Sequence, residues 1–236
     1  MLNEILFYIV AFLSNIIMVI TGFAGTMLAM PPSMLLIGVN EAKAILNVMG
    51  WLSCVWVVIR DYKYIDIKKF LKIIIVMFIG MVVGIQLFKI APMNFLLTAY
   101  AILIILIALK KLFIQKEIKV PQSLMIIVLL IAGLVHGMFV SGGSFLVVYA
   151  VTVLSDKNEF RATVSAVWVL LNGYLMFDHF MQGFFTPDVI RMTVICIIPL
   201  AASVIIGNKL HDKINQQAFL KLTYILLLIA GIMLIV

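Results

Sequence analysis

The chain has 236 residues, of which 65% are hydrophobic and 11% are charged, and its mean hydropathy is +1.26. A soluble domain carries about 45–50% apolar residues, so this composition excludes one and predicts an all-α polytopic membrane protein. The net charge of +7 comes from Lys and Arg residues in short loops between apolar segments, with no compact basic face. We therefore interpret these residues as topology signals and expect no nucleic-acid partner.

Eight apolar stretches follow one another and predict the membrane segments. They are Leu2–Leu36, Ala44–Ile59, Phe70–Phe88, Met93–Phe113, Leu124–Leu154, Ala162–Phe177, Val189–Leu210 and Phe219–Val236. The fifth would measure on the order of 45 Å as one helix, whereas the hydrocarbon core of a bilayer is ~30 Å thick. We expect the long first and fifth stretches to be broken and re-entrant. The first is also expected to be retained, because no cleavable signal pattern opens the chain.

The two halves of the chain are repeats of one another. A shift of 118 positions lays Asn40-Glu41-Ala-Lys43 over Asn158-Glu159-Phe-Arg161, and Ala24-Gly25-Thr26 over Gly142-Gly143-Ser144. The first repeat covers residues 1–118 and the second covers residues 119–236. Each repeat is predicted to be one broken segment followed by three transmembrane helices, within a single membrane domain.

The distribution of Lys and Arg favours an inverted arrangement of the two repeats. If all eight stretches cross, the 17 basic residues divide into ten and seven. If the two long stretches are hairpins, fourteen lie on one face and only Lys43, Lys89 and Arg191 on the other. The positive-inside rule prefers the second model. It predicts a multi-pass protein of the cytoplasmic membrane with both termini outside and cytoplasmic loops at 60–72, 110–119, 157–161 and 209–221.

Glycine and serine residues interrupt both long stretches and predict the tips of the hairpins. Glycine allows a positive φ and a close approach by another backbone. A half-helix that begins after such a turn offers free N–H groups and a positive dipole end to an anion. We expect substrate binding at both tips, by Gly22, Ala24, Gly25, Thr26, Ser141, Gly142, Gly143 and Ser144. The alternative is that glycines only allow close helix packing, the role that we assign to Gly80 and Gly84.

These features together resemble the TauE/SafE family of sulfite exporters and related anion permeases, over nearly the whole chain. The second half carries Gly137-Met-Phe-Val-Ser-Gly-Gly-Ser144 and Glu159-Phe-Arg-Ala-Thr163; the first carries Gly22-Phe-Ala-Gly-Thr26, followed by Pro31-Pro32. The resemblance implies gradient-driven transport of small sulfur-containing or carboxylated anions across the cytoplasmic membrane. Ala24, Thr26 and Ser141 interrupt the glycine runs, and Lys43-Ala-Ile replaces Arg-Ala-Thr, which leaves the substrate open.

Several polar residues near the start of the second and sixth stretches are candidates for anion contacts. Arg161 is predicted to clamp the anion at the inner mouth, since a guanidinium fork suits sulfonate or carboxylate. Lys43 is expected to act as a point charge at the outer mouth. For both residues, snorkelling or pairing with Glu159 or Glu41 is the alternative. Further candidates are Thr163, Ser165 and Asn47, which otherwise bond to their own helices, and Asn172, which is expected to line a path.

Other residues are assigned plainer roles. His136 is a candidate proton relay, with a neutral histidine between helices as the alternative. Trp51, Trp56, Trp168 and Tyr174 are interpreted as packing or interface anchors, and Asp178-His179 as an outer helix end. Cys54 and Cys196 have no metal-ligand spacing, so we expect neither a metal nor a cofactor. No catalytic motif is present, which argues against an enzyme.

The sequence thus favours a secondary transporter that carries a small organic or sulfur oxyanion by alternating access between two halves. The alternative is a non-transporting membrane assembly or structural subunit whose glycines serve packing, and an intramembrane enzyme is the third reading. The expected partners are the anionic substrate and the lipid bilayer. The exact substrate, the direction of transport, the coupling ion and a homodimer are left open.

Overall fold

The computed structural model of the protein describes residues 2–113, 121–154 and 156–211, together with 213, 225, 228 and 232. Within these residues every regular element is a helix, which confirms the predicted all-α class. Most of the eighth predicted stretch, the repeat boundary at 118/119 and parts of the predicted loops at 110–119 and 209–221 lie outside the described residues. The elements are α1 Leu2–Thr21, α2 Ala24–Ile37, α3 Val39–Asp61, η1 Tyr62–Tyr64, α4 Ile67–Ile90, α5 Met93–Phe113, α6 Gln122–Phe139, α7 Gly143–Val153, α8 Lys157–Met181 and α9 Pro187–His211.

Five of the described helices are long and apolar enough to cross a membrane, namely α1, α3 with η1, α4, α8 and α9. Four further apolar helices are shorter. Large apolar side chains face outward from these helices, as Ile75, Ile79 and Val83 do from α4. Exposed apolar surface on this scale suits a lipid environment, so the protein is an integral membrane protein.

Both long stretches are broken where the sequence predicted. Two residues separate α1 from α2, and Gly22 between them has a φ of 79°. Three residues separate α6 from α7, and there Val140 takes the left-handed conformation, with a φ of 55°. The shift of 118 positions lays Gly22 on Val140, so the reversal occupies the same place in both halves. The glycines of the second break therefore do not supply its positive φ.

The glycines beside the two breaks instead let each hairpin close on itself. A Cβ atom on Gly25 would lie 2.3 Å from the carbonyl oxygen of Ser14, and one on Gly142 would lie 2.1 Å from that of Ala132. Real Cβ contacts are never this short, so a side chain at either position would push the two helices apart. Glycine is thus required here for close approach of α2 to α1 and of α7 to α6.

Helices α3 and α8 pack against each other at the centre and run antiparallel. The indole N–H of Trp51 donates to the carbonyl oxygen of Val169 over 3.0 Å, and Nδ2 of Asn47 donates to that of Asn172, also over 3.0 Å. Residue numbers thus rise along α3 as they fall along α8. Trp51 and Val169 are equivalent under the shift of 118, so the helices cross at matching positions.

These two helices are longer than the apolar stretches that predicted them. Lys43 and Arg161 were expected to open short helices, but each lies one turn inside. For α8 the reason is capping, since the Asp156 carboxylate accepts hydrogen bonds from the N–H groups of Asn158 and Glu159, both over 2.9 Å, whereas α3 begins after Gly38 without a side-chain cap. A capped polar first turn extends a helix beyond its apolar part.

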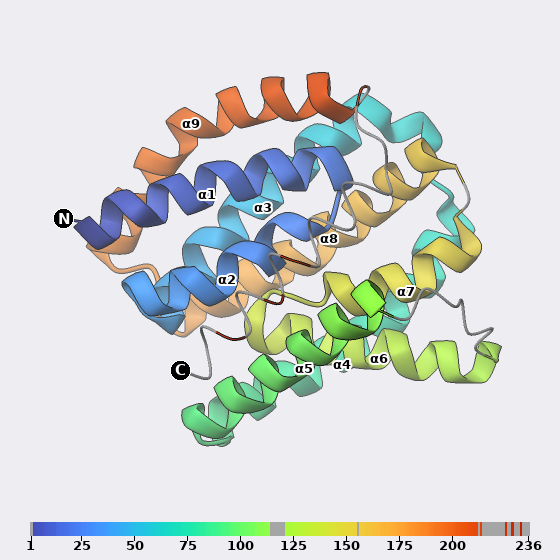
Figure 1. Cartoon of the computed structure of the whole chain (residues 1–236), viewed down its shortest axis with the longest axis horizontal. Helices are drawn as coiled ribbons and strands as arrows, with labels where there is room; N and C mark the ends of the chain where they lie inside the picture. Colours follow the sequence, from blue (N-terminus) through green and yellow to red (C-terminus); the bar gives the residue numbers. More distant parts are fainter. Residues whose placement is uncertain are drawn as a thin grey trace.

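One further pair of helices flanks the α3–α8 pair on each side. Helix α1 lies beside α9, and α4 lies beside α6 on the other side of α3 and α8 (Figure 1). Cβ atoms on Gly80 and Gly84 would each lie 2.1 Å from a carbonyl oxygen of α6, which confirms their packing role. Each pair joins one helix from each half of the chain, so the two sequence repeats interleave in space.

The antiparallel α3–α8 pair has two ends that differ in their side chains. We call one the Arg161 end, formed by Asp61, Asp66, Lys69, Glu159, Arg161 and Asn208. The other is the Lys43 end, formed by Lys43, Phe88, Lys89, Asp178, His179 and Phe184. Helix α4 runs parallel to α8 and is ion-paired to it at both ends, by Lys69 with Glu159 and by Lys89 with Asp178.

Candidate functional site

The two breaks meet each other between α3 and α8. A Cβ atom on Gly143, the first residue of α7, would lie 2.8 Å from the carbonyl oxygen of Phe23, the residue before α2. The first turn of the α1–α2 hairpin also reaches α8, since a Cβ atom on Gly22 would lie 3.1 Å from the Arg161 carbonyl oxygen. The start of both half-helices is therefore brought to one place, and the turn at Gly22 extends past it toward the Arg161 end.

Polar side chains from four helices surround this meeting point. We call them the tip site: Thr26, His136, Ser144, Trp168 and Asn172. A Cβ atom on Gly50 would lie 2.8 Å from Cγ2 of Thr26 and 3.7 Å from Nδ2 of Asn172, so Gly50 leaves room for both. The rings of His136 and Trp168 lie 4.6 Å apart between centroids. The Asn172 amide is also within interaction range of His136.

Most of the tip site's polar atoms are buried and make no hydrogen bond within the part of the chain that the structure describes. They are Ser144 Oγ, Trp168 Nε1, Asn172 Oδ1 and both ring nitrogens of His136. Burying such a group without a partner costs about 1–3 kcal/mol, and more than nine in ten find one. The Ser144 hydroxyl, the Trp168 indole N–H and the His136 imidazole thus converge here, and each can form a hydrogen bond with a polar ligand.

The two half-helices differ in how their first N–H groups are satisfied. Thr21 Oγ1 accepts from the N–H groups of Phe23 and Ala24, over 3.3 and 3.2 Å. The start of α7 has no side-chain cap. The first N–H groups of a helix have no partner inside it and lie at the positive end of its dipole. The start of α7 is thus the more open anion-binding end of the two.

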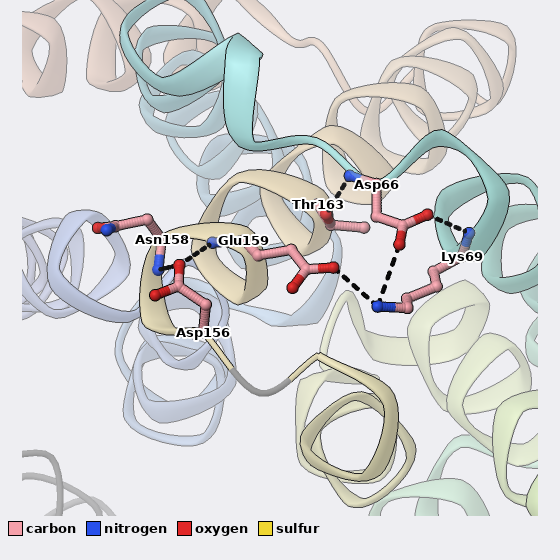
Figure 2. A network of polar contacts seen from close by, with 6 residues as sticks. All are labelled: Asp66, Lys69, Asp156, Asn158, Glu159 and Thr163. Atoms are coloured by element: carbon pink, nitrogen blue, oxygen red, sulfur yellow. Dashed lines mark hydrogen bonds and ion pairs between the residues drawn. The ribbon is translucent and has the colours of Figure 1, made fainter.

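At the Arg161 end, a network of hydrogen bonds and ion pairs ties the start of α4 to the start of α8 (Figure 2). Lys69 Nζ lies 2.8 Å from Glu159 Oε1 and 3.0 Å from Asp66 Oδ2. The N–H of Asp66 donates to Thr163 Oγ1 over 3.0 Å. Hydrogen bonds from the backbone N–H and the ammonium group of Lys69 hold the pKa of Asp66 below its ordinary value. A shallow surface hollow opens beside this network, between the η1–α4 connection and the start of α8.

Arg161 lies behind this network and is 2% exposed. Its Nη2 donates to Asn208 Oδ1 over 2.7 Å, and its Nη1 lies 3.8 Å from Asp61 Oδ2. Glu159, one of the partners considered for Arg161, is bonded to Lys69 instead. The guanidinium group is thus oriented by an amide on α9 and a carboxylate at the end of α3.

Lys43, the equivalent cation at the other end, is also 2% exposed but has different surroundings. Its Nζ lies 3.2 Å from the centroid of the Phe88 ring. Among the described residues, no carboxylate lies within ion-pair distance of it. The nearby carboxylate of Asp178 is bonded to Lys89 over 3.0 Å and to the amide of Gln182. Burying an unpaired charge is costly, so this position is unusual.

The predicted site residues fall into three groups. Thr26, His136, Gly143, Ser144 and Asn172 meet at the tip site, where Asn47 supports Asn172. Gly22 lies against Arg161 and Ser165, on the side of the tip site that faces the Arg161 end, and Thr163 belongs to the network there. Ala24, Gly25, Ser141 and Gly142 pack the hairpins, and the Ser141 hydroxyl donates to the Phe139 carbonyl oxygen over 2.8 Å. Lys43 stands apart from all of these.

Sequence reasoning missed Trp168, which was interpreted as a packing or interface anchor. A signal was present in the sequence, since Arg161, Ser165, Trp168 and Asn172 are spaced as one face of a helix. That stripe runs from the Arg161 end to the tip site. His179 was interpreted as an outer helix end and is completely buried. Lys69 was counted only as a topology signal, yet it ties two helices together.

The fold and the tip site together define the class of protein. Broken membrane helices whose ends converge on buried polar groups are typical of secondary transporters. The sequence model of the family described as sulfite exporter TauE/SafE matches residues 7–234, and the chain belongs to this family of membrane transporters. This confirms the resemblance seen in the sequence. No curated protein and no solved structure matches the chain.

Proposed function

We propose that the protein carries small sulfur-containing or organic anions, such as sulfite, sulfonates or carboxylates, across the cytoplasmic membrane by alternating access. The observation that carries this proposal is the tip site, where two half-helix starts meet around buried polar atoms that lack hydrogen bonds. A small oxyanion is the ligand that such donors suit. An anion there accepts from Ser144, Trp168 and the first N–H groups of α7.

Two inverted halves are supported by three features of the packing. Helices α3 and α8, which are equivalent in the repeats, run antiparallel and cross at the equivalent residues Trp51 and Val169. The left-handed residues Gly22 and Val140 are also equivalent. The α1–α9 and α4–α6 pairs each join a hairpin helix of one half to a crossing helix of the other. A twofold axis in the membrane plane accounts for all three.

The proposed topology places the Arg161 end at the cytoplasmic face and the Lys43 end at the outer face. Single cysteines introduced into a protein without Cys54 and Cys196 test this assignment. A cysteine at Asn158 should react with an impermeant thiol reagent only from the cytoplasmic side, and one at Asp188 only from outside. Labelling of Asn158→Cys from outside would overturn the inverted arrangement.

The ion pairs between α4 and α8 are the proposed gates of the two ends. Lys69 with Glu159 and Lys89 with Asp178 each join a residue of the first half to one of the second. Opening one end requires its pair to separate, while the other pair keeps the opposite end closed. Arg161 lies on the same face of α8 as Trp168 and Asn172 of the tip site. It then guides the anion between the cytoplasm and the tip site.

A binding screen on purified protein in detergent tests the function. A ligand that binds only the folded state stabilises it, by about 2.7 kcal/mol at a hundred times its Kd. We expect at least one of sulfite, thiosulfate, taurine, sulfoacetate and acetate to raise the melting temperature saturably. The same anion should enter proteoliposomes made with the wild-type protein and stay outside empty vesicles.

The variant that tests the tip site is Ser144→Ala, which removes one hydrogen-bond donor of the site without adding bulk. It should lower the affinity for the same anion by about ten- to a hundredfold, as expected for one hydrogen bond to a charged group of about 1.5–3 kcal/mol. If no anion in the screen binds or crosses, the alternative of a non-transporting structural subunit takes the place of this proposal.

A further inference from the structure

The Lys43 end contains two buried basic side chains that both lie near the ring of Phe184. Lys43 comes from α3 and the fully buried His179 from α8. The ring of His179 stacks on Phe184 with 5.4 Å between centroids, and Lys43 Nζ lies 5.8 Å from the same Phe184 ring. Neither ring nitrogen of His179 makes a hydrogen bond within the described residues.

The charged and titratable groups around this pair do not neutralise it. Asp178 on α8 is the one acid that acts on Lys43, but its carboxylate is held by Lys89 and Gln182. Lys89 on α4 and His136 on α6 are further basic groups within electrostatic range. Helices α3, α4, α6 and α8 thus each place a basic group near this region, and the nearby carboxylate that they share is that of Asp178.

Two buried bases without their own counter-charge are costly to fold unless an anion joins them. The aromatic rings of Phe88 and Phe184 cover Lys43 and keep water away from it. Exclusion of water lowers the local dielectric constant and strengthens the attraction for any anion that enters. The nearby carboxylate, that of Asp178, is already bonded to Lys89 and Gln182 and so competes little with such an anion.

We propose that Lys43 and His179 form a second anion-binding subsite, at the Lys43 end and distinct from the tip site, which takes one small oxyanion. This inference rests on the proposed function, because the ligand is the transported anion on its way to or from the outer face. Lys43 supplies an ammonium group with three donors, and His179 supplies one ring N–H.

Aromatic side chains separate this subsite from the tip site. The Phe88 ring that covers Lys43 lies 6.1 Å from the ring of Phe139, which in turn stacks on Tyr100 at 4.4 Å. Phe139 is the last residue of α6, directly before the break at Val140. These rings connect the cover of Lys43 to the break beside the tip site, so aromatic side chains separate the subsite from the tip site.

Binding at this subsite should take up a proton. An anion beside His179 favours the imidazolium form, which supplies a second charge-assisted hydrogen bond. By linkage, an anion that binds together with one proton gains up to about tenfold in affinity for each unit of pH decrease. The subsite therefore predicts that outer anion binding strengthens on acidification.

Isothermal titration of the full-length protein in detergent with thiosulfate, between pH 6 and 8, tests the subsite. Thiosulfate keeps the same charge throughout this range, so its own titration does not enter. We expect Lys43→Gln to lower the affinity by on the order of ten- to a hundredfold, the effect of one charge-assisted hydrogen bond. His179→Gln should lower it less and weaken the pH dependence. Lys43→Arg should retain binding, because the charge remains.

Arg191→Gln is the control, since it removes a positive charge at the surface, where Arg191 pairs with Glu4 over 3.0 Å. Its thiosulfate affinity should equal that of the wild type. Wild-type affinity in folded Lys43→Gln, or an unchanged pH dependence in folded His179→Gln, would overturn the subsite and leave the proposed function intact. If none of the anions in the binding screen, thiosulfate included, binds the wild type, both proposals fall together.

Discussion

The Arg161 end and the Lys43 end occupy equivalent positions in the two repeats but have different chemistry. Arg161 is held by Asn208 and Asp61, and a carboxylate network lies in front of it. Lys43 lies under Phe88, and no carboxylate of the described residues is within ion-pair distance of it. Each end has a buried cation one turn inside its helix, but the groups around the two cations differ.

This difference has a physical consequence for an anion that moves between the ends. A guanidinium group that is already oriented by fixed partners presents a rigid fork, which suits repeated capture and release. An ammonium group with aromatic neighbours and no acid partner depends on the anion itself for its counter-charge. The two ends of one path would then bind the same anion by different means.

The largest effect is expected from a substitution at the tip site, where the two breaks meet. Gly143→Leu should abolish transport from either side, because its side chain enters the space against Phe23. It should cost less folded protein than Gly80→Leu, since a Cβ atom would lie 2.8 Å from the Phe23 carbonyl oxygen at Gly143 but 2.1 Å from the Leu130 carbonyl oxygen at Gly80. The control is Gly80→Leu, which lies against the backbone of Leu130 and should mainly reduce the amount of folded protein. Transport of a radiolabelled anion and size-exclusion profiles distinguish the two. Equal losses of folded protein at both sites would return Gly143 to a packing role.

The next effect sharpens the contrast between the two cations. Arg161→Gln should lower anion affinity by about ten- to a hundredfold, because a charge-assisted hydrogen bond contributes about 1.5–3 kcal/mol. Arg161→Lys should cost less, since it keeps the charge and loses only the fork. At the other end, Lys43→Arg should bind as well as the wild type. Unchanged affinity in a well-folded Arg161→Gln protein would remove Arg161 from the anion path.

A smaller effect is expected from the two matched ion pairs. The side chains of Lys69 and Lys89 are 34% and 35% exposed, so each pair is screened by solvent and contributes little to the closed state. Lys69→Met should speed thiol labelling of a cysteine at Ser165, and Lys89→Met that of a cysteine at Asn47, which is the equivalent residue. Both reporters are placed in a protein without Cys54 and Cys196. Equal changes at both reporters would contradict independent gates.

The smallest effect concerns the pH dependence of the Arg161 end. Because the folded protein lowers the pKa of Asp66, its charged form stabilises the fold at neutral pH, and this stabilisation is lost as the pH falls through the lowered pKa. The melting-temperature difference between wild type and Asp66→Asn should therefore stay constant from about pH 5 to 8 and shrink below about 3.9. A difference that grows on acidification would contradict this assignment.

Much of the fold could be predicted because it follows from local properties of the chain. Apolar length alone required the first and fifth stretches to break, and their glycines located the breaks within a few residues. The left-handed residue of the second break could not be predicted, since Val140 carries no preference for that conformation. Its conformation follows from the packing of α7 against α6.

The candidate site was predicted less completely than the fold. Ser144, Asn172 and His136 were identified as polar residues in apolar surroundings, whereas Trp168 and His179 were assigned to packing or to a helix end. An aromatic ring or a histidine at a helix end is common in membrane proteins, so residue type alone carries little information. Only the antiparallel packing of α3 on α8 shows that His179 is buried beside Lys43.

The sequence by itself determined the membrane class and the places where the helices break, because hydrophobic length and glycine sterics act within a few residues. Only the tertiary structure decided that α1 packs on α9 and α4 on α6, and that Arg161 has fixed polar partners while Lys43 has aromatic ones. The energy of a buried charge depends on every group within several ångströms of it. In this protein those groups come from helices of both halves, far apart along the chain.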